Sequence, residues 1–378
     1  MEYDRMMKVH SILAKAAEGR NRMKKSATLK SSSDQSSNKL LWSLVSVFIA
    51  AATIWGVISQ ARAFSFDAFL SYFLDASIPW ILAAIVCMLG FIIFEGMAIA
   101  TICRAFGYRV NRRQGFVYSA SDIYFSAITP SATGGQPMCA FFMIRDGIPG
   151  SVTTLVLIIN LTMYTVSILF LGLITLILQP NIFLTFGLLS RILIAIGFLA
   201  QGLLTLLFLM LLVKRDLLRR ICLRVLRFLC KIKLLRHEDE KRKKLEIYVE
   251  EYAMYSRILR EHREPMLKAL IFNLLQRVSV ISVPLCVFLA SGGKIAQAAR
   301  IWAVQCCTVI GSNTIPIPGA MGVSDYIMLD GFSEIVHLRD VVNFELLSRS
   351  MSFYVCVLIC GITALIAHLR SRRRKKRT

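Results

Sequence analysis

Residues 152–178 read VTTLVLIINLTMYTVSILFLGLITLIL, an apolar run of 27 residues that contains no Asp, Glu, Lys or Arg. An α-helix of about 20 apolar residues crosses the ~30 Å hydrocarbon core of a bilayer, so this run predicts a transmembrane helix. The whole chain has 56% hydrophobic and 18% charged residues, whereas soluble domains have about 25% charged residues. This composition excludes a soluble enzyme, a collagen, a disordered chain and a secreted disulfide scaffold. It predicts an all-α polytopic integral membrane protein.

Other apolar runs lie on both sides of this one, and two further apolar stretches are interrupted by Gly and Pro. Each uninterrupted run is long enough to cross the bilayer as a helix. We therefore expect about six full spans, at residues 40–59, 78–100, 152–178, 192–213, 266–290 and 346–369.

The net charge of +22 is concentrated in three polar stretches, residues 1–39, 214–268 and 369–378. Lys and Arg beside membrane spans collect on the cytoplasmic side, so all three stretches are expected there. The sequence thus predicts a multi-pass protein of the cell membrane with both termini in the cytoplasm. Basic stretches also attract anionic lipid headgroups, which makes membrane phospholipids the expected partners and DNA an unexpected one.

This topology requires two segments to leave and re-enter the membrane on one side. Residues 120–151 must start and end at the cytoplasmic face, and residues 291–346 at the outer face. Both contain dense Gly and Pro interruptions, and non-helical backbone at membrane depth survives only when it is buried in protein or lines a cavity. We expect two Gly/Pro-broken re-entrant hairpins that meet near the midplane, similar to the inverted repeats of transporters.

The sequence divides into five segments on this basis. The basic loop contains the helical pattern of residues 217–235, which has one apolar and one basic face. This pattern favours a helix in the cytoplasmic interface, or a cytoplasmic extension of the preceding span. A second surface helix is expected at residues 238–263, with Leu245, Val249 and Tyr252 facing inward. The segments are a disordered basic cytoplasmic tail (1–39), a first membrane half (40–213), a basic cytoplasmic amphipathic loop (214–265), a second membrane half (266–369) and a basic cytoplasmic tail (370–378).

The first candidate binding site is the Gly/Pro-rich run at residues 129–137. Pro removes a backbone donor, Gly-Gly lets the chain turn or approach a ligand, and broken helix ends expose N–H groups that suit a phosphate or carboxylate. Arg145 could supply a cation at headgroup depth. The alternative is a kinked helix without a ligand. The candidate residues are Thr129, Pro130, Ser131, Thr133, Gly134, Gly135, Gln136 and Pro137.

The second candidate site is the run PIPGAMGVSD at residues 316–325, to which the same arguments apply. Its candidate residues are Pro316, Pro318, Gly319, Gly322 and Asp325, and the alternative is an ordinary loop outside the membrane.

Four charged residues are isolated inside apolar stretches, namely Glu95, Asp122, Arg277 and Arg349. A charge at mid-bilayer costs at least ~2.5–3.5 kcal/mol, so each should pair or line a polar cavity. Arg277 and Arg349 could bind a lipid phosphate or pair with an acid, the candidate acids being Glu95, Asp122 and Asp325. Glu95 could also reach the nearby interface.

No pattern for catalysis, a metal or a cofactor stands out. The ten cysteines form no C-x-x-C pair, and the five histidines are scattered, so no catalytic residue, metal ligand or cofactor is predicted. The cysteines are expected to be reduced residues that fill the core.

The runs TPSATGGQPMCAFFMIRDGIP (129–149) and IPIPGAMGVSDYIM (315–328) resemble the lysylphosphatidylglycerol synthase transmembrane (flippase-like) family. The first is similar to the signature T-P-x-x-x-G-G-x-P and the second to P-x-P-G-x-x-G-x-x-[ED], and the resemblance covers about residues 40–370. Gln136 and Cys139 stand where many members have Glu and a basic residue, and Asp325 stands where Glu is usual.

The resemblance implies a bacterial membrane domain that binds phospholipid. In two-domain members this domain moves lysyl-phosphatidylglycerol between leaflets, which protects against cationic antimicrobial peptides, while a C-terminal cytoplasmic domain transfers lysine from lysyl-tRNA. We therefore expect flippase-type translocation of an anionic or aminoacylated phospholipid. The alternatives are a phosphatidylglycerol lysyltransferase, alone or with a separate transferase subunit, and a membrane scaffold. No transferase domain is visible up to Thr378. A separate transferase or a second copy of the chain are further candidate partners.

Overall fold

The computed structural model describes residues 66–129, 132–213, 215–231, 245–246, 248–252, 263–313, 315, 322–336 and 340–375. They all belong to one compact unit, Ala63–Thr378. The predicted tail (1–39) and first span (40–59) lie outside the described residues. So do five of the candidate site residues, namely Pro130, Ser131, Pro316, Pro318 and Gly319.

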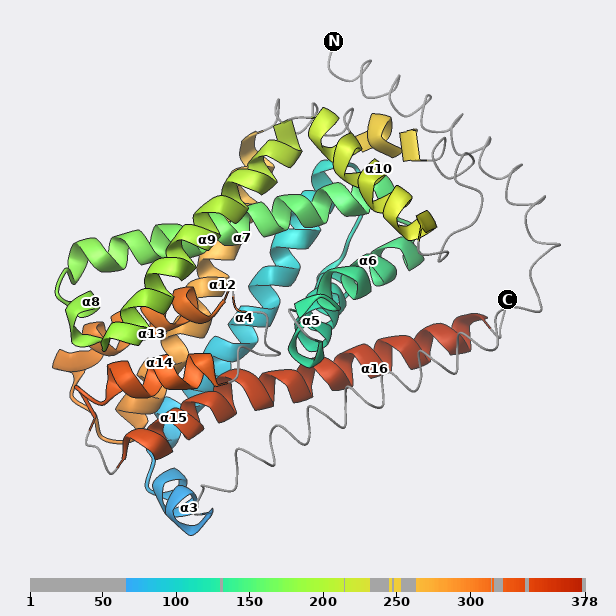
Figure 1. Cartoon of the computed structure of the whole chain (residues 1–378). Coiled ribbons are helices and arrows are strands. Elements are labelled where there is room, and N and C mark those ends of the chain that lie inside the picture. The colour runs from blue at the N-terminus through green and yellow to red at the C-terminus, as the bar shows by residue number, and fades with distance from the viewer. Residues whose placement is uncertain are drawn as a thin grey trace. The chain divides into compact units, whose positions relative to one another are not determined.

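Helices form all the regular structure in the described part of the chain, which confirms the predicted fold class (Figure 1). Five helical stretches are long and apolar enough to cross a membrane, and they correspond to the five predicted spans that lie within the described residues. They are α4 (Ile78–Ala105), α7 (Gly150–Leu178), α9 (Leu188–Val213), α12 (Arg263–Ala290) and the succession of α15 (Val341–Arg349), the π-helical turn η5 (Ser350–Tyr354) and α16 (Val355–Lys375).

The helices α4 and α12 form an antiparallel pair at the centre of the unit. The Ser77 N–H donates to the carbonyl of Ala290 at 2.8 Å, so the start of α4 lies beside the end of α12. Met88 and Ile92 of α4 pack with Val287 of α12 in the main apolar core. The ends of this pair define two opposite ends of the unit, and the end at which α4 finishes is called the basic end below.

The remaining helices are short. Those at the site are α5 (Arg112–Ile128) and α6 (Gly135–Arg145), which follow α4, and α13 (Ala298–Ser312) and α14 (Val323–Phe332), which follow α12. The others are α3 (Phe66–Leu74), α8 (Ile182–Thr185), α10 (Arg215–Lys231) and the 3₁₀ turn η3 (Ile295–Gln297).

The helices α5 and α6 form the first hairpin. A capping box starts α5, in which Asn111 and Gln114 exchange side-chain bonds of 2.9 and 3.1 Å with each other's backbone N–H groups. The Tyr118 hydroxyl donates to Asp146 Oδ2 at 2.9 Å, so the chain returns beside the start of α5 after α6 ends. With 11 residues, α6 is too short to cross a bilayer, so this segment is re-entrant as predicted.

The helices α13 and α14 form the second hairpin. Arg300, near the start of α13, lies 3.9 Å from Glu334, which follows the end of α14. Because α13 begins where α12 ends and α5 begins where α4 ends, the antiparallel pair makes the two hairpins enter from opposite ends. The charge pattern predicted this arrangement, and the structure confirms it.

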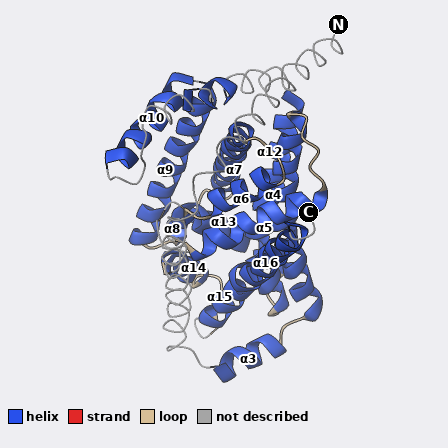
Figure 2. Cartoon of the chain, turned by 90° about the vertical axis from the view of Figure 1, so that its right-hand side faces the viewer, coloured by secondary structure: helices blue, strands red, loops and turns tan. Residues whose placement is uncertain are grey.

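Part of the basic loop packs on the basic end. Within the pattern 217–235, α10 forms a helix that Figures 1 and 2 show turned away from the axis of α9. Val249 and Tyr252 are buried as expected, and the Tyr252 hydroxyl donates to the carbonyl of Leu211 at 3.3 Å.

Candidate functional site

A cavity of about 570 Å³, the central cavity below, lies where the two hairpins approach one another. The first break is defined as residues 129–134, between α5 and α6, and the second as residues 313–322, between α13 and α14. Ala132 of the first break and both Asn313 and Ile315 of the second line this cavity. Two interruptions that are far apart in the sequence therefore share one space.

Hydrogen bonds of Thr129 bridge the first break. Its hydroxyl donates to the carbonyl of Phe125 at 2.6 Å and accepts from the Gly134 N–H at 2.9 Å. Between them Ala132 has a φ of 52°, in the left-handed region that residues other than Gly seldom adopt. Thr129 and Ala132 thus fix a sharp reversal of the chain without a continuous helix.

Gly135 lets α6 start in direct contact with α5. A Cβ atom at this position would collide with the side chains of Asp122 and Ser126. This close approach brings Gln136 to Asp122, where its Nε2 donates to Oδ2 at 2.7 Å. Packing of one hairpin arm on the other therefore explains this Gly, which the sequence alone had linked to ligand approach.

Two carboxylates line the central cavity beside the first hairpin. Asp122 accepts from Gln136 and, at 3.4 Å, from Ser126, while Glu95 accepts from Ser119 at 3.1 Å and from Gln276 at 3.0 Å. Both acids are 6% exposed. All four donors are neutral side chains, so these hydrogen bonds fix the orientation of the two acids without placing a cation on them.

Arg277 of α12 is the cation of the central cavity. Its guanidinium lies over the rings of Phe91 and Tyr164, with its central carbon 5.0 and 4.3 Å from their centroids. Among the described residues its Nε has no hydrogen-bond acceptor and no carboxylate forms an ion pair with it. The Tyr164 hydroxyl donates to Asn313 Oδ1 at 2.7 Å, which connects this cation to the second break.

Several amide atoms around the cavity are buried and lack a partner within the described part of the chain. They are Oε1 of Gln136, Oε1 of Gln276 and both polar atoms of the Gln201 amide. An unsatisfied polar group is costly in an apolar environment, so these atoms indicate a space that takes water or a polar ligand.

An ion pair holds the second break, outside the central cavity. Asp325 accepts from the Gly322 N–H at 2.8 Å, where Gly322 has a φ of 82°, and its carboxylate pairs with Arg349. Arg349 also lies 3.7 Å from Glu345, one turn earlier on α15. Of the pairings that the sequence left open, the structure therefore shows Arg349 with Asp325.

Arg145 does not reach the central cavity. It lies at the far end of α6, 3.6 Å from Asp146 and over the ring of Phe142, where it lines a different pocket. Of the other candidate residues, Gln136, Glu95, Asp122 and Arg277 line the central cavity. Thr129, Gly134, Gly135, Gly322, Asp325 and Arg349 shape or hold the two breaks, and Thr133 and Pro137 are exposed.

Sequence reasoning missed several residues that the structure places at the cavity or the ion pair, among them Tyr164, Gln201, Gln276 and Glu345. The first three are polar side chains inside otherwise apolar spans, a signal that was available. Glu345 could have been found from its i,i+4 spacing to Arg349, which places both on one helix face. Within the described residues, no group of His, Cys, Asp or Glu side chains could hold a metal ion, and the cysteines there are free and mostly buried.

A family model of the lysylphosphatidylglycerol synthase TM region matches residues 43–360, which is most of the chain and includes both breaks. The chain belongs to this family. No curated protein matches the sequence. Family membership and the apolar helices together make the chain an integral membrane protein of lysylphosphatidylglycerol synthesis or translocation.

Proposed function

We propose that the central cavity binds the polar head of a phospholipid and carries it between the leaflets of the membrane. The observation on which this rests is Arg277, a buried cation that lines a cavity between two broken hairpins and has no acceptor for its Nε among the described residues. A lipid phosphate would supply that acceptor through a charge-assisted hydrogen bond.

The charges of the cavity favour a head that also carries amines. One guanidinium suits one phosphate, and the neighbouring acidic side chains of Glu95 and Asp122 suit amines. Lysyl-phosphatidylglycerol has this set of groups, with one phosphate and the two amines of its lysine. The volume of about 570 Å³ is within the ~300–1,000 Å³ typical of small-ligand pockets.

Movement would occur at the hairpins, because each is held to its surroundings by a few polar contacts at its break. Opening one hairpin while the other stays closed would expose the cavity to one leaflet at a time, which is the alternating access of transporters. The Arg349–Asp325 ion pair would close the second hairpin, and the contacts of Thr129 and Gln136 would close the first.

Resistance to cationic antimicrobial peptides would follow from this activity. Moving an aminoacylated lipid to the outer leaflet makes that surface less negative, and the attraction of cationic peptides depends on its negative potential.

Translocation by proteoliposomes that contain the full chain and fluorescent lysyl-phosphatidylglycerol tests the proposal. Arg277→Gln should slow movement about tenfold or more, because a hydrogen bond to a charged group contributes about 1.5–3 kcal/mol. The matched control is Lys268→Gln, which removes an exposed cation from the same helix and should leave the rate unchanged.

Equal rates for Arg277→Gln and the folded wild type would overturn the proposal. Aminoacyl-lipid formed by the purified chain from lysyl-tRNA and phosphatidylglycerol would instead favour the lysyltransferase alternative.

A further inference from the structure

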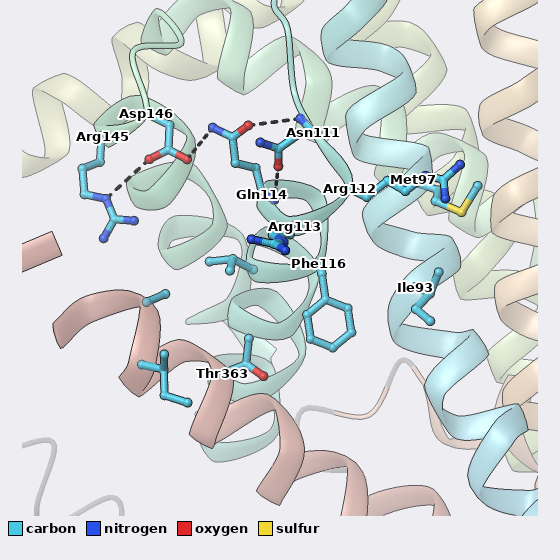
Figure 3. A pocket seen from close by; sticks show the side chains of 13 residues that line it. Ile93, Met97, Asn111, Arg112, Arg113, Gln114, Phe116, Arg145, Asp146 and Thr363 are labelled. Carbon is cyan, nitrogen blue, oxygen red and sulfur yellow. Dashed lines mark hydrogen bonds and ion pairs between the residues drawn. The ribbon is translucent and has the colours of Figure 1, made fainter. Parts of the chain in front are cut away.

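A second pocket, of about 1,120 Å³, lies at the basic end and is separate from the central cavity. It is lined by residues of α4, α5, α6 and α16, and is called the arginine pocket below (Figure 3). We propose that it binds an anionic phospholipid of the cytoplasmic leaflet, with the headgroup on its arginines and an acyl chain along its apolar wall.

The charge of this pocket is positive and largely uncompensated. Among the described residues that line it, Arg112, Arg113 and Arg145 are basic and Asp146 alone is acidic, so these four side chains carry a formal charge of +2. Asp146 already accepts from Tyr118 and Gln114 and pairs with Arg145. No described carboxylate pairs with Arg112 or Arg113, and both are exposed. With respect to the described part of the chain, these two arginines can therefore hold an anion.

The arginines rather than the helix end provide the anion site. The side chain of Asn111 already accepts from the Gln114 N–H in the capping box of α5, so this donor of the helix end is not available to an anion. Figure 3 shows Arg113 pointing into the space above Phe116, while Arg112 points toward Met97 of α4. The cations thus flank the wall that α4 and α5 form.

Most of the other lining residues are apolar, and they point to a lipid rather than a free anion. Phe116 lies one turn into α5, and Ile93 lies 12 residues before the end of α4, roughly 18 Å into the unit at 1.5 Å per residue. Ile366 of α16 lines the same pocket and is 45% exposed. The charged rim of the pocket matches the headgroup of a phospholipid, and the apolar wall matches its acyl chain.

The position of the pocket at the basic end favours a lipid of the cytoplasmic leaflet. Lys and Arg collect at the cytoplasmic ends of spans, and the pocket lies at the end where Arg104 and the arginine-rich α10 also lie. Anionic phospholipids give this leaflet a negative surface potential that draws basic residues to it.

Native mass spectrometry of the detergent-purified full chain, titrated with phosphatidylglycerol or phosphatidylcholine, tests the site. The measurements use Arg277→Gln as the background, so that lipid bound through Arg277 of the central cavity does not enter the reading. In this background Arg112→Ala/Arg113→Ala should weaken phosphatidylglycerol binding about 30-fold, at ~1 kcal/mol for each basic residue. Phosphatidylcholine binding should already be weak and change little.

Two further variants distinguish binding in this pocket from non-specific electrostatic attraction between anionic lipid and the basic residues of the chain. Arg224→Ala/Arg227→Ala removes the same charge from exposed positions of α10 and should leave affinity within about twofold, since it spares the pocket. Thr363→Phe keeps every charge but fills part of the apolar wall, and it should weaken binding as well.

The proposal would be overturned if the Arg112/Arg113 variant bound phosphatidylglycerol like its background, or if the α10 control lost as much affinity. Competition by glycerol phosphate, which has the charged head but no acyl chain, would overturn it in favour of a soluble anion. Because Arg277 is absent throughout, failure of this site leaves the translocation proposal untouched.

Discussion

The first hairpin is held at its break by hydrogen bonds of neutral donors, to the Asp122 carboxylate and between Thr129 and the backbone, whereas the second is held by an ion pair. In the first, Gln136 and Thr129 make the connections, and Asp122 lines the central cavity. In the second, Arg349 pairs with Asp325 and lies beside Glu345, away from the central cavity. In the proposed translocation the first hairpin therefore supplies binding groups, while the Arg349–Asp325 ion pair, called the latch below, holds the second hairpin closed.

Removing the cation of the latch should have the largest effect on stability. Arg349→Gln leaves two acids that are 13% and 6% exposed in their side chains without this partner. Breaking a buried ion pair on one side costs about 3–5 kcal/mol, so the free energy of unfolding in detergent micelles should fall by about that amount. Denaturant titration followed by circular dichroism measures it.

The control for this experiment is again Lys268→Gln, because its partner Glu264 is exposed and solvent screens the pair. Its stability should match the wild type. If Arg349→Gln were as stable as this control, the second hairpin would not depend on charge and the contrast between the hairpins would fail.

A smaller loss of stability is expected when a substitution forces the two helices of the first hairpin apart. The added methyl group of Gly135→Ala would collide with the side chains of Asp122 and Ser126, and overpacking of this kind costs about 1–3 kcal/mol. The collision should also separate Gln136 from Asp122, so headgroup binding should weaken together with stability. Thermal unfolding and lipid titration of the same preparation measure both effects.

Gly202→Ala on α9 is the matched control, since no atom lies within 4 Å of the added methyl group. Ala is the better helix former, so this variant should be neutral or slightly more stable than the wild type. A loss at both glycines alike would mean that the added methyl group itself, rather than contact between α5 and α6, lowers stability.

The spans and the opposed hairpins could be predicted because their signals are local in the sequence. Apolar length marks a span, and clusters of Lys and Arg mark one side of the membrane. Which partner each charged side chain inside a span contacts could not be predicted in this way. Arg277 and Arg349 look alike in sequence, yet one stacks on two rings beside a cavity and the other pairs with two acids. That distinction depends on how each helix is rotated about its axis, which tertiary packing decides.

The position of Arg145 shows the same limit. Its distance of eight residues from Pro137 suggested that both serve one site, but eight residues of helix span about 12 Å. The rise of α6 therefore carries this side chain out of the central cavity and into the arginine pocket.

The smallest expected effect is a gain in stability, and it concerns the chain reversal at Ala132 in the first break. Ala132 has a φ of 52°, and the left-handed conformation costs a residue with a Cβ about 1–2 kcal/mol. Gly removes this cost but loses about 0.5–1 kcal/mol through the greater freedom of the unfolded chain. Ala132→Gly should therefore raise the free energy of unfolding by about 0.5–1 kcal/mol, measured by the same denaturant titration.

Ala140→Gly, inside α6 of the same hairpin, is its counterpart, because a helical backbone gives Gly no advantage and stability should fall by about 1 kcal/mol. Opposite signs for the two substitutions would show that the first break holds a strained reversal that its hydrogen bonds maintain. A loss at both positions would mean that the reversal is relaxed. In that case the Thr129 contacts, rather than the conformation of Ala132, would set the shape of the cavity wall.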